Sequence, residues 1–119
     1  MNTYPKLFSP IKIGETTVKN RVFMPPISTN LADKGYVTDA LVEHYAARAK
    51  GGVGLIVTEV TTVEPTYVYL PGDMSICDDS YIPGWEKLTA GPSTSTAQRF
   101  CRSFFILLTW HSRFLVLRG

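Results

Sequence analysis

The sequence contains few cysteines and no long apolar run. Its 119 residues include only Cys77 and Cys101, which are too few for a disulfide-stabilised scaffold. No apolar stretch reaches the roughly 18 residues of a membrane-spanning helix, and residues 1–9 lack the apolar region of a secretory signal. With 45% hydrophobic residues, we expect one small globular domain in the cytoplasm, without a membrane partner.

Acidic side chains and lysine are missing from the last thirty residues. Residues 90–119 contain four arginines and no Lys, Asp or Glu, so this stretch carries a formal charge of +4. Residues 1–89 contain eight basic and ten acidic residues and carry −2. Because a folded domain normally mixes both signs on its surface, the composition predicts a boundary near Thr89. We therefore treat residues 1–89 and 90–119 as separate units.

The first unit shows the periodicity of an α/β fold. Thr38 has the side chain of a helix N-cap, and apolar residues then recur at four-residue spacing up to Gly51. The predicted elements, in order, are a hairpin at 11–19, a strand at 20–24, a helix at 38–50, a strand at 53–58 and a helix starting at Ile82. Two apolar strands joined by one helix form a βαβ unit with a right-handed crossover. Such a unit cannot bury both sheet faces alone, so we expect the opening of a larger α/β fold.

Several motifs in a fixed order carry a family resemblance. They are Leu7-Phe-Ser-Pro-Ile-Lys-Ile-Gly14, Val18-Lys-Asn-Arg-Val-Phe-Met-Pro-Pro26, Gly35-Tyr-Val-Thr-Asp39, and His44-Tyr-Ala-Ala-Arg-Ala-Lys-Gly-Gly-Val-Gly-Leu-Ile-Val-Thr-Glu59. Together they resemble the start of the old yellow enzyme family, over roughly residues 5–89. The segment from Asp78 to Pro83 is most similar to the branch of 2,4-dienoyl-CoA and enoate reductases.

The resemblance implies a fold, a cofactor and an activity. The fold would be the N-terminal part of a (β/α)8 TIM barrel, namely a hairpin plus the first βαβ unit, and it would be incomplete. The cofactor would be FMN, reduced by NADH or NADPH, and the substrate an enone, enoate or enoyl thioester. Hydride would pass to the β-carbon of an activated C=C bond. The catalytic residues and any iron–sulfur cysteines would lie beyond this chain, so no catalytic or metal-binding residue is assigned.

By the same resemblance, five residues would contact the flavin. Pro25, Pro26, Ile27 and Ser28 form the loop after the first strand, and Val60 follows the second strand. Barrel enzymes bind their ligands at the carboxyl ends of the strands. The prolines would stiffen the backbone there, and the Ser28 hydroxyl would stabilise a reduced flavin. Relatives have a small residue where this chain has Val60.

The family pattern stops after Thr89. One choice of codons for residues 92–107, read from the third base of the Pro92 codon, encodes Val-His-Lys-His-Gly-Ala-Lys-Ile-Leu-Pro-Gln-Leu-Phe-His-Pro, which resembles the missing third-strand segment. We therefore predict that residues 90–119 are an out-of-frame, poorly ordered tail; a genuinely divergent tail is the alternative.

Two other functions stay open. The chain could be a non-catalytic truncated product. It could also be a small binding module whose basic tail contacts nucleic acid or anionic lipid, although the tail has no regular basic spacing. We expect a small-molecule substrate and no nucleic-acid partner.

Overall fold

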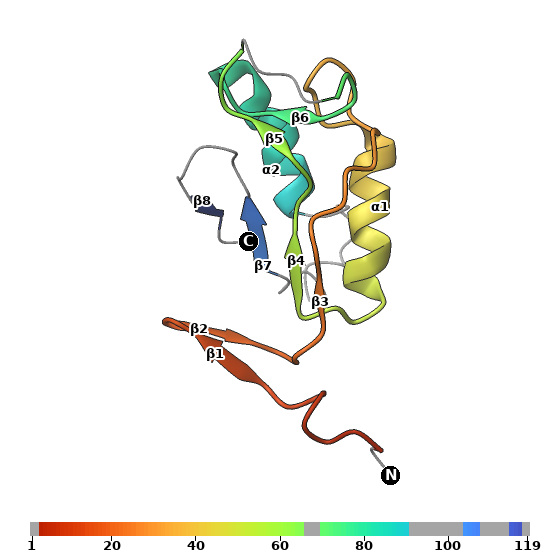
Figure 1. Ribbon diagram of the computed structural model, residues 1–119, viewed down its shortest axis with the longest axis vertical. Coiled ribbons are helices and arrows are strands. Elements are labelled where there is room, and N and C mark those ends of the chain that lie inside the picture. Colours follow the sequence, from red (N-terminus) through yellow and green to blue (C-terminus); the bar gives the residue numbers. More distant parts are fainter. Residues whose placement is uncertain (1–2, 66–69, 91–103, 108–114, 118–119) are drawn as a thin grey trace.

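A short hairpin precedes the α/β unit. The computed structural model describes residues 3–65, 70–90, 104–107 and 115–117. In the hairpin, strand β1 (Ile11–Ile13) pairs antiparallel with β2 (Thr16–Val18). Gly14 has a φ of +57° in the turn, a conformation that glycine adopts without steric cost. The predicted hairpin is therefore present, at the end where the next strands begin (Figure 1).

The predicted βαβ unit follows the hairpin. Strand β3 (Phe23–Met24) is parallel to β4 (Leu55–Val57), and helix α1 (Asp39–Lys50) connects them. The N-cap is Thr38, whose Oγ1 accepts a hydrogen bond from the Leu41 N–H at 3.2 Å. Gly52, at φ +98°, follows the helix end. The order and direction of these elements are as predicted.

Both strands begin later than predicted. At their predicted starts, backbone N–H and carbonyl groups form hydrogen bonds outside the regular pairing of the two strands. The Asn20 side chain accepts from the Val22 N–H and donates to the Gly52 carbonyl oxygen. The N–H groups of Gly54 and Leu55 both donate to the Val22 carbonyl. A Cβ on Gly54 would lie 2.5 Å from Asn20 Oδ1. Regular pairing therefore starts only at Phe23 and Leu55.

Further strands extend the structure on two sides. Strand β7 (Phe104–Leu107) is parallel to β4, and β8 (Leu115–Leu117) is antiparallel to β7. At the carboxyl end of β4, β5 (Thr61–Thr62) pairs in parallel with β6 (Met74–Ser75), a two-residue pairing that the sequence did not predict. The 3-10 helix η1 (Asp79–Tyr81) then leads into α2 (Ile82–Ala90).

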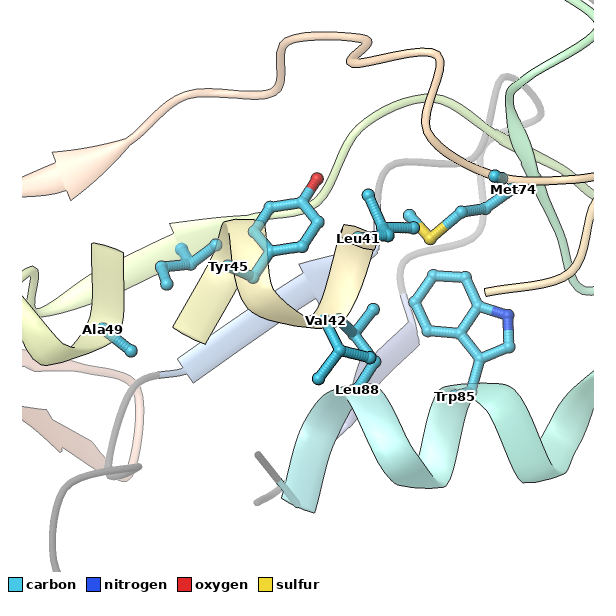
Figure 2. Close-up of a cluster of buried hydrophobic side chains, with 9 residues drawn as sticks. Leu41, Val42, Tyr45, Ala49, Met74, Trp85 and Leu88 are labelled. Atoms are coloured by element: carbon cyan, nitrogen blue, oxygen red, sulfur yellow. The ribbon is translucent and has the colours of Figure 1, made fainter. Parts of the chain in front are cut away.

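The hydrophobic core lies between the two helices and the strands. From α2, the side chains of Trp85 and Leu88 point toward α1, where Leu41 and Val42 meet them (Figure 2). Met74 of β6 closes the same cluster and is completely buried. The Trp85 Nε1–H donates to the Ser75 carbonyl at 2.8 Å, which satisfies its one polar atom. This core fixes α2 against the βαβ unit.

Candidate functional site

The candidate site lies where β3 and β4 end. Strand β3 ends at Met24 and continues into a loop that reaches Thr38, and β4 ends at Val57, just before Thr58, Glu59 and Val60. Because β3 and β4 are parallel, their carboxyl ends lie at the same edge of the sheet. This is the edge at which barrel proteins bind ligands. In Figure 1 the β5–β6 pair stands at the same end.

The first four residues of the loop present an apolar surface. Pro25 and Pro26 are exposed, and the Ile27 side chain is 60% exposed. Ser28 and Val60 are half-buried. Exposed apolar atoms and a half-buried hydroxyl therefore follow one another along this segment.

One hydrogen bond brings the two predicted segments together. The Thr29 backbone N–H donates to Oε2 of Glu59 at 2.5 Å. Ser28 directly precedes Thr29 and Val60 directly follows Glu59, so this bond joins the chain next to Ser28 to the chain next to Val60. Contact of the five residues with a flavin stays a prediction.

Beyond Thr29 the loop is anchored at several points. Asn30 adopts φ +58°, and its Oδ1 accepts from the Gly72 N–H at 2.9 Å. The Ala32 N–H donates to the Gly72 carbonyl at 3.1 Å, and Thr38 Oγ1 donates to the Leu31 carbonyl at 2.6 Å. A Cβ on Gly72 would meet Asn30 Oδ1 at 2.3 Å. Only glycine therefore allows this close approach.

Glu59 is a buried acid among few polar groups. Its side chain is completely buried and Asp73 is 3% exposed. Burial raises the pKa of Glu59 above its ordinary value of 4.5, and the nearby negative charge of Asp73 raises it further, while the Thr29 hydrogen bond opposes both effects. Glu59 Oε1 and Asp73 Oδ1 have no hydrogen-bond partner within the described residues. The site therefore contains two buried carboxyl groups, each with one oxygen that has no hydrogen-bond partner among the described residues.

The arrangement fits a flavin ring. An isoalloxazine is flat, with apolar faces and a polar edge that seeks hydrogen bonds. Pro25, Pro26 and Ile27 offer apolar contacts, and Ser28 offers a hydroxyl. Within the described part of the chain, no hydrogen bond occupies the backbone N–H of Ile27 or Ser28. Both donors are therefore available for the polar edge of a ring.

Sequence reasoning did not single out the residues that hold this site. It named Ser28 and Val60 and omitted their neighbours Thr29 and Glu59, and it gave Asn30 and Asp73 no role. One signal was present: Glu59 directly follows an apolar strand that is buried in the sheet. A carboxyl group in that position needs a partner, and its partner is thirty residues away.

The parallel βαβ unit, with the loop after β3 at its carboxyl edge, belongs to the α/β class of proteins, which bind ligands at that edge. The particular family follows from comparison with known proteins. Residues 6–92 match the NADH:flavin oxidoreductase / NADH oxidase family, and the chain belongs to this family. The resemblance predicted from the sequence motifs is confirmed.

Relatives and solved structures agree with this assignment. The chain is 41% identical over 87 residues to the NADPH dehydrogenase of Bacillus subtilis, a match that covers 71% of the chain and 25% of the relative. It is similar to 2-naphthoyl-CoA reductase in complex with 2-naphthoyl-CoA, with a TM-score of 0.80, 30% identity and coverage of 92% of the chain and 16% of that structure. It is also similar to the old yellow enzyme homologue from Zymomonas mobilis, with a TM-score of 0.74, 30% identity and coverage of 90% and 28%.

These matches also settle the fold class. The similar structures are TIM-barrel enzymes, and the chain spans between 16% and 28% of their length. The chain is therefore the N-terminal part of a (β/α)8 barrel, as predicted. The relatives are flavin oxidoreductases that use NADH or NADPH.

Some expectations stay predictions. Most of residues 90–119 lie outside the described residues, so the out-of-frame tail and the boundary near Thr89 are untested, as are the basic-tail binding module and the cytoplasmic location. Among the helices that the structure describes, none has both the length and the apolar character to cross a membrane. The described residues also contain no cluster of three or more His, Cys, Asp or Glu side chains suited to a metal ion.

Proposed function

We propose that this chain supplies the near face of the flavin site in an FMN-dependent oxidoreductase that reduces activated C=C bonds with NADH or NADPH. The observation that carries the proposal is the Thr29–Glu59 hydrogen bond, which joins the residue after Ser28 to the residue before Val60 at the carboxyl edge of the sheet. Enones, enoates and enoyl thioesters are the proposed substrates. A thioester is supported by the similarity to a reductase that was solved with 2-naphthoyl-CoA.

The residues of this chain would bind and orient the ring. FMN, when bound, supplies the hydride for reduction of the substrate. Pro25 and Pro26 restrict the backbone, so the loop loses little conformational entropy when the ring binds. Ile27 excludes water from one face, and the Ser28 hydroxyl donates to the polar edge, where it favours the reduced, anionic ring. Val60 limits the space on the side of β4.

We further propose that a polypeptide of these 119 residues alone neither holds FMN stably nor reduces 2-cyclohexenone. In this fold the phosphate site commonly lies near the seventh and eighth strands. The Pro25–Ser28 loop and Val60 provide contacts for the ring only. The remaining barrel strands would have to supply the phosphate contacts and the groups that anchor the substrate.

A chimera tests the flavin site directly. Residues 6–89 of this chain would replace the aligned segment of the Bacillus subtilis NADPH dehydrogenase, to which they are similar. We expect the purified chimera to bind FMN and to oxidise NADPH with 2-cyclohexenone, whereas the 119-residue chain alone should do neither. The matched control is the unaltered dehydrogenase, prepared in parallel.

Two results would contradict the proposal. A chimera that folds, as judged by circular dichroism and by size, but retains no FMN would remove the flavin-binding role of the segment. Enone reduction above a free-flavin blank by the 119-residue chain, with its length verified by mass, would refute the proposed inactivity of that polypeptide.

A further inference from the structure

The backbone around Glu59 is fixed by two neighbouring elements. The Glu59 N–H donates to the Tyr45 hydroxyl of α1 at 2.9 Å. The Glu59 carbonyl accepts from Thr61 Oγ1, on β5, at 3.1 Å. Both bonds are buried, and Tyr45 is itself only 1% exposed. The backbone that carries the Glu59 side chain is therefore held in place at the end of β4.

The carboxylate is costly at this position. It is completely buried, and only one of its two oxygens has a hydrogen-bond partner in the described part of the chain. An apolar side chain of similar volume would avoid this desolvation, at the cost of leaving the Thr29 N–H without its acceptor. The burial of the acid therefore opposes folding, and only its hydrogen bond offsets that cost. What the acid provides is an acceptor for the Thr29 N–H.

This acceptor is the first anchor of the loop after β3. The anchors at Asn30, Ala32 and Thr38 all lie further along the chain, and within the described residues no earlier hydrogen bond holds Ile27 or Ser28. A shift at Thr29 would therefore move the residues just before it. On the other side of these residues the chain is held at Met24, which pairs with Ile56 of β4, so the Thr29–Glu59 bond fixes the second end of the Pro25–Ser28 segment.

We propose that Glu59 is a positioning residue for the flavin: its buried carboxylate fixes the Pro25–Ser28 loop against Val60 through the Thr29 amide. The proposal rests on the proposed function, since it assigns the loop to the flavin. Glu59 does not touch the ring; it acts through the backbone of Thr29. Two groups flank the carboxyl group, Asp73 by charge and Tyr45 through the backbone N–H of Glu59.

The first test observes the loop without any flavin. Amide hydrogen exchange and 1H–15N spectra would be measured on the 119-residue chain and on three variants. Glu59→Ala removes the acceptor, Glu59→Gln keeps a neutral acceptor oxygen, and Asp73→Asn is the matched control. Asp73 is almost as buried, and its Oδ2 accepts from the Leu70 N–H and not from Thr29.

We expect a specific pattern of protection at Thr29. Glu59→Ala should lower the protection of the Thr29 amide by about tenfold or more, as the loss of a hydrogen bond to a charged acceptor predicts. Glu59→Gln should restore most of that protection. Asp73→Asn should keep the Thr29 amide protected but shift its titration to lower pH, because this variant removes the charge that raises the pKa of Glu59. In the unaltered chain the Thr29 amide shift should titrate with the Glu59 carboxyl, and in Glu59→Gln this titration should disappear. Unchanged protection in Glu59→Ala, or a Thr29 shift that stays flat with pH, would overturn the proposal.

The second test measures FMN binding by the chimera described above, with and without the Glu59 carboxylate. Glu59→Ala should weaken FMN binding by about tenfold and broaden the flavin absorbance bands, and Glu59→Gln should restore both. If the unaltered chimera binds FMN and Glu59→Ala changes its Kd by less than twofold, the positioning role is wrong although the proposed function stands. If the unaltered chimera binds no FMN, the proposed function fails, and the Thr29 protection pattern still reports whether the carboxylate holds the loop.

Discussion

The hydroxyl of Tyr45 links α1 to the end of β4, and its removal should be costly. Tyr45 is 1% exposed, and its hydroxyl accepts the Glu59 N–H at 2.9 Å. In Figure 2 the hydroxyl points away from the cluster formed with α2. Tyr45→Phe keeps the ring and leaves almost no cavity. It does leave a buried backbone N–H without this acceptor, which costs about 1–3 kcal/mol.

The expected shift is large enough to measure by urea unfolding. For a loss of about 2 kcal/mol and a slope of about 2 kcal/mol per molar urea, the midpoint falls by about 1 M. The matched control is Tyr36→Phe: Tyr36 is 47% exposed, and its hydroxyl lies 3.3 Å from Ser80 Oγ at the surface. That change should stay within about 0.5 kcal/mol. A Tyr45→Phe midpoint equal to that of Tyr36→Phe would refute the reasoning.

Two further predictions concern the loop and its buried acid. Thr38→Ala removes the N-cap of α1 and a bond to the Leu31 carbonyl; it should lower the unfolding free energy by about 1–2 kcal/mol, and Thr38→Ser should recover most of the loss in the same urea assay. Because the pKa of Glu59 is raised in the folded state, its contribution to stability is greatest below the ordinary glutamate pKa and is lost as pH rises through the higher folded value. Urea titrations from pH 4 to 8 should therefore show a decline that Glu59→Gln reduces; an identical slope in both proteins would contradict this linkage.

The local part of the fold could be predicted because its signals are local. The Thr38 cap, the four-residue spacing of apolar residues and the glycines at 51 and 52 predict α1 to within one residue. The strand ends could not be predicted in the same way. The Asn20 side chain forms hydrogen bonds with the Val22 N–H and the Gly52 carbonyl. No sequence pattern predicts that a side chain will take the place of a hydrogen bond between strands.

In the candidate site, too, local features could be predicted from the sequence and long-range contacts could not. The loop from Pro25 to Ser28 could be predicted from the sequence, because two prolines directly after an apolar strand form a recognisable motif. The Thr29–Glu59 and Asn30–Gly72 contacts span 30 and 42 residues, so their partners are known only once the chain is folded. The β5–β6 pairing was missed for a related reason: two-residue strands have no periodicity to detect.

The two prolines after β3 have a second consequence. Within the described residues β3 pairs with β4 alone, so its other edge is unpaired, and Phe23 on this strand is 60% exposed. Such an edge invites association with a strand of another molecule. Pro25 and Pro26 have no N–H to donate. A second strand that paired along this edge of β3 would therefore find no backbone donor at the two residues after Met24. The two prolines after β3 thus also limit how far a strand of another molecule can pair along this edge.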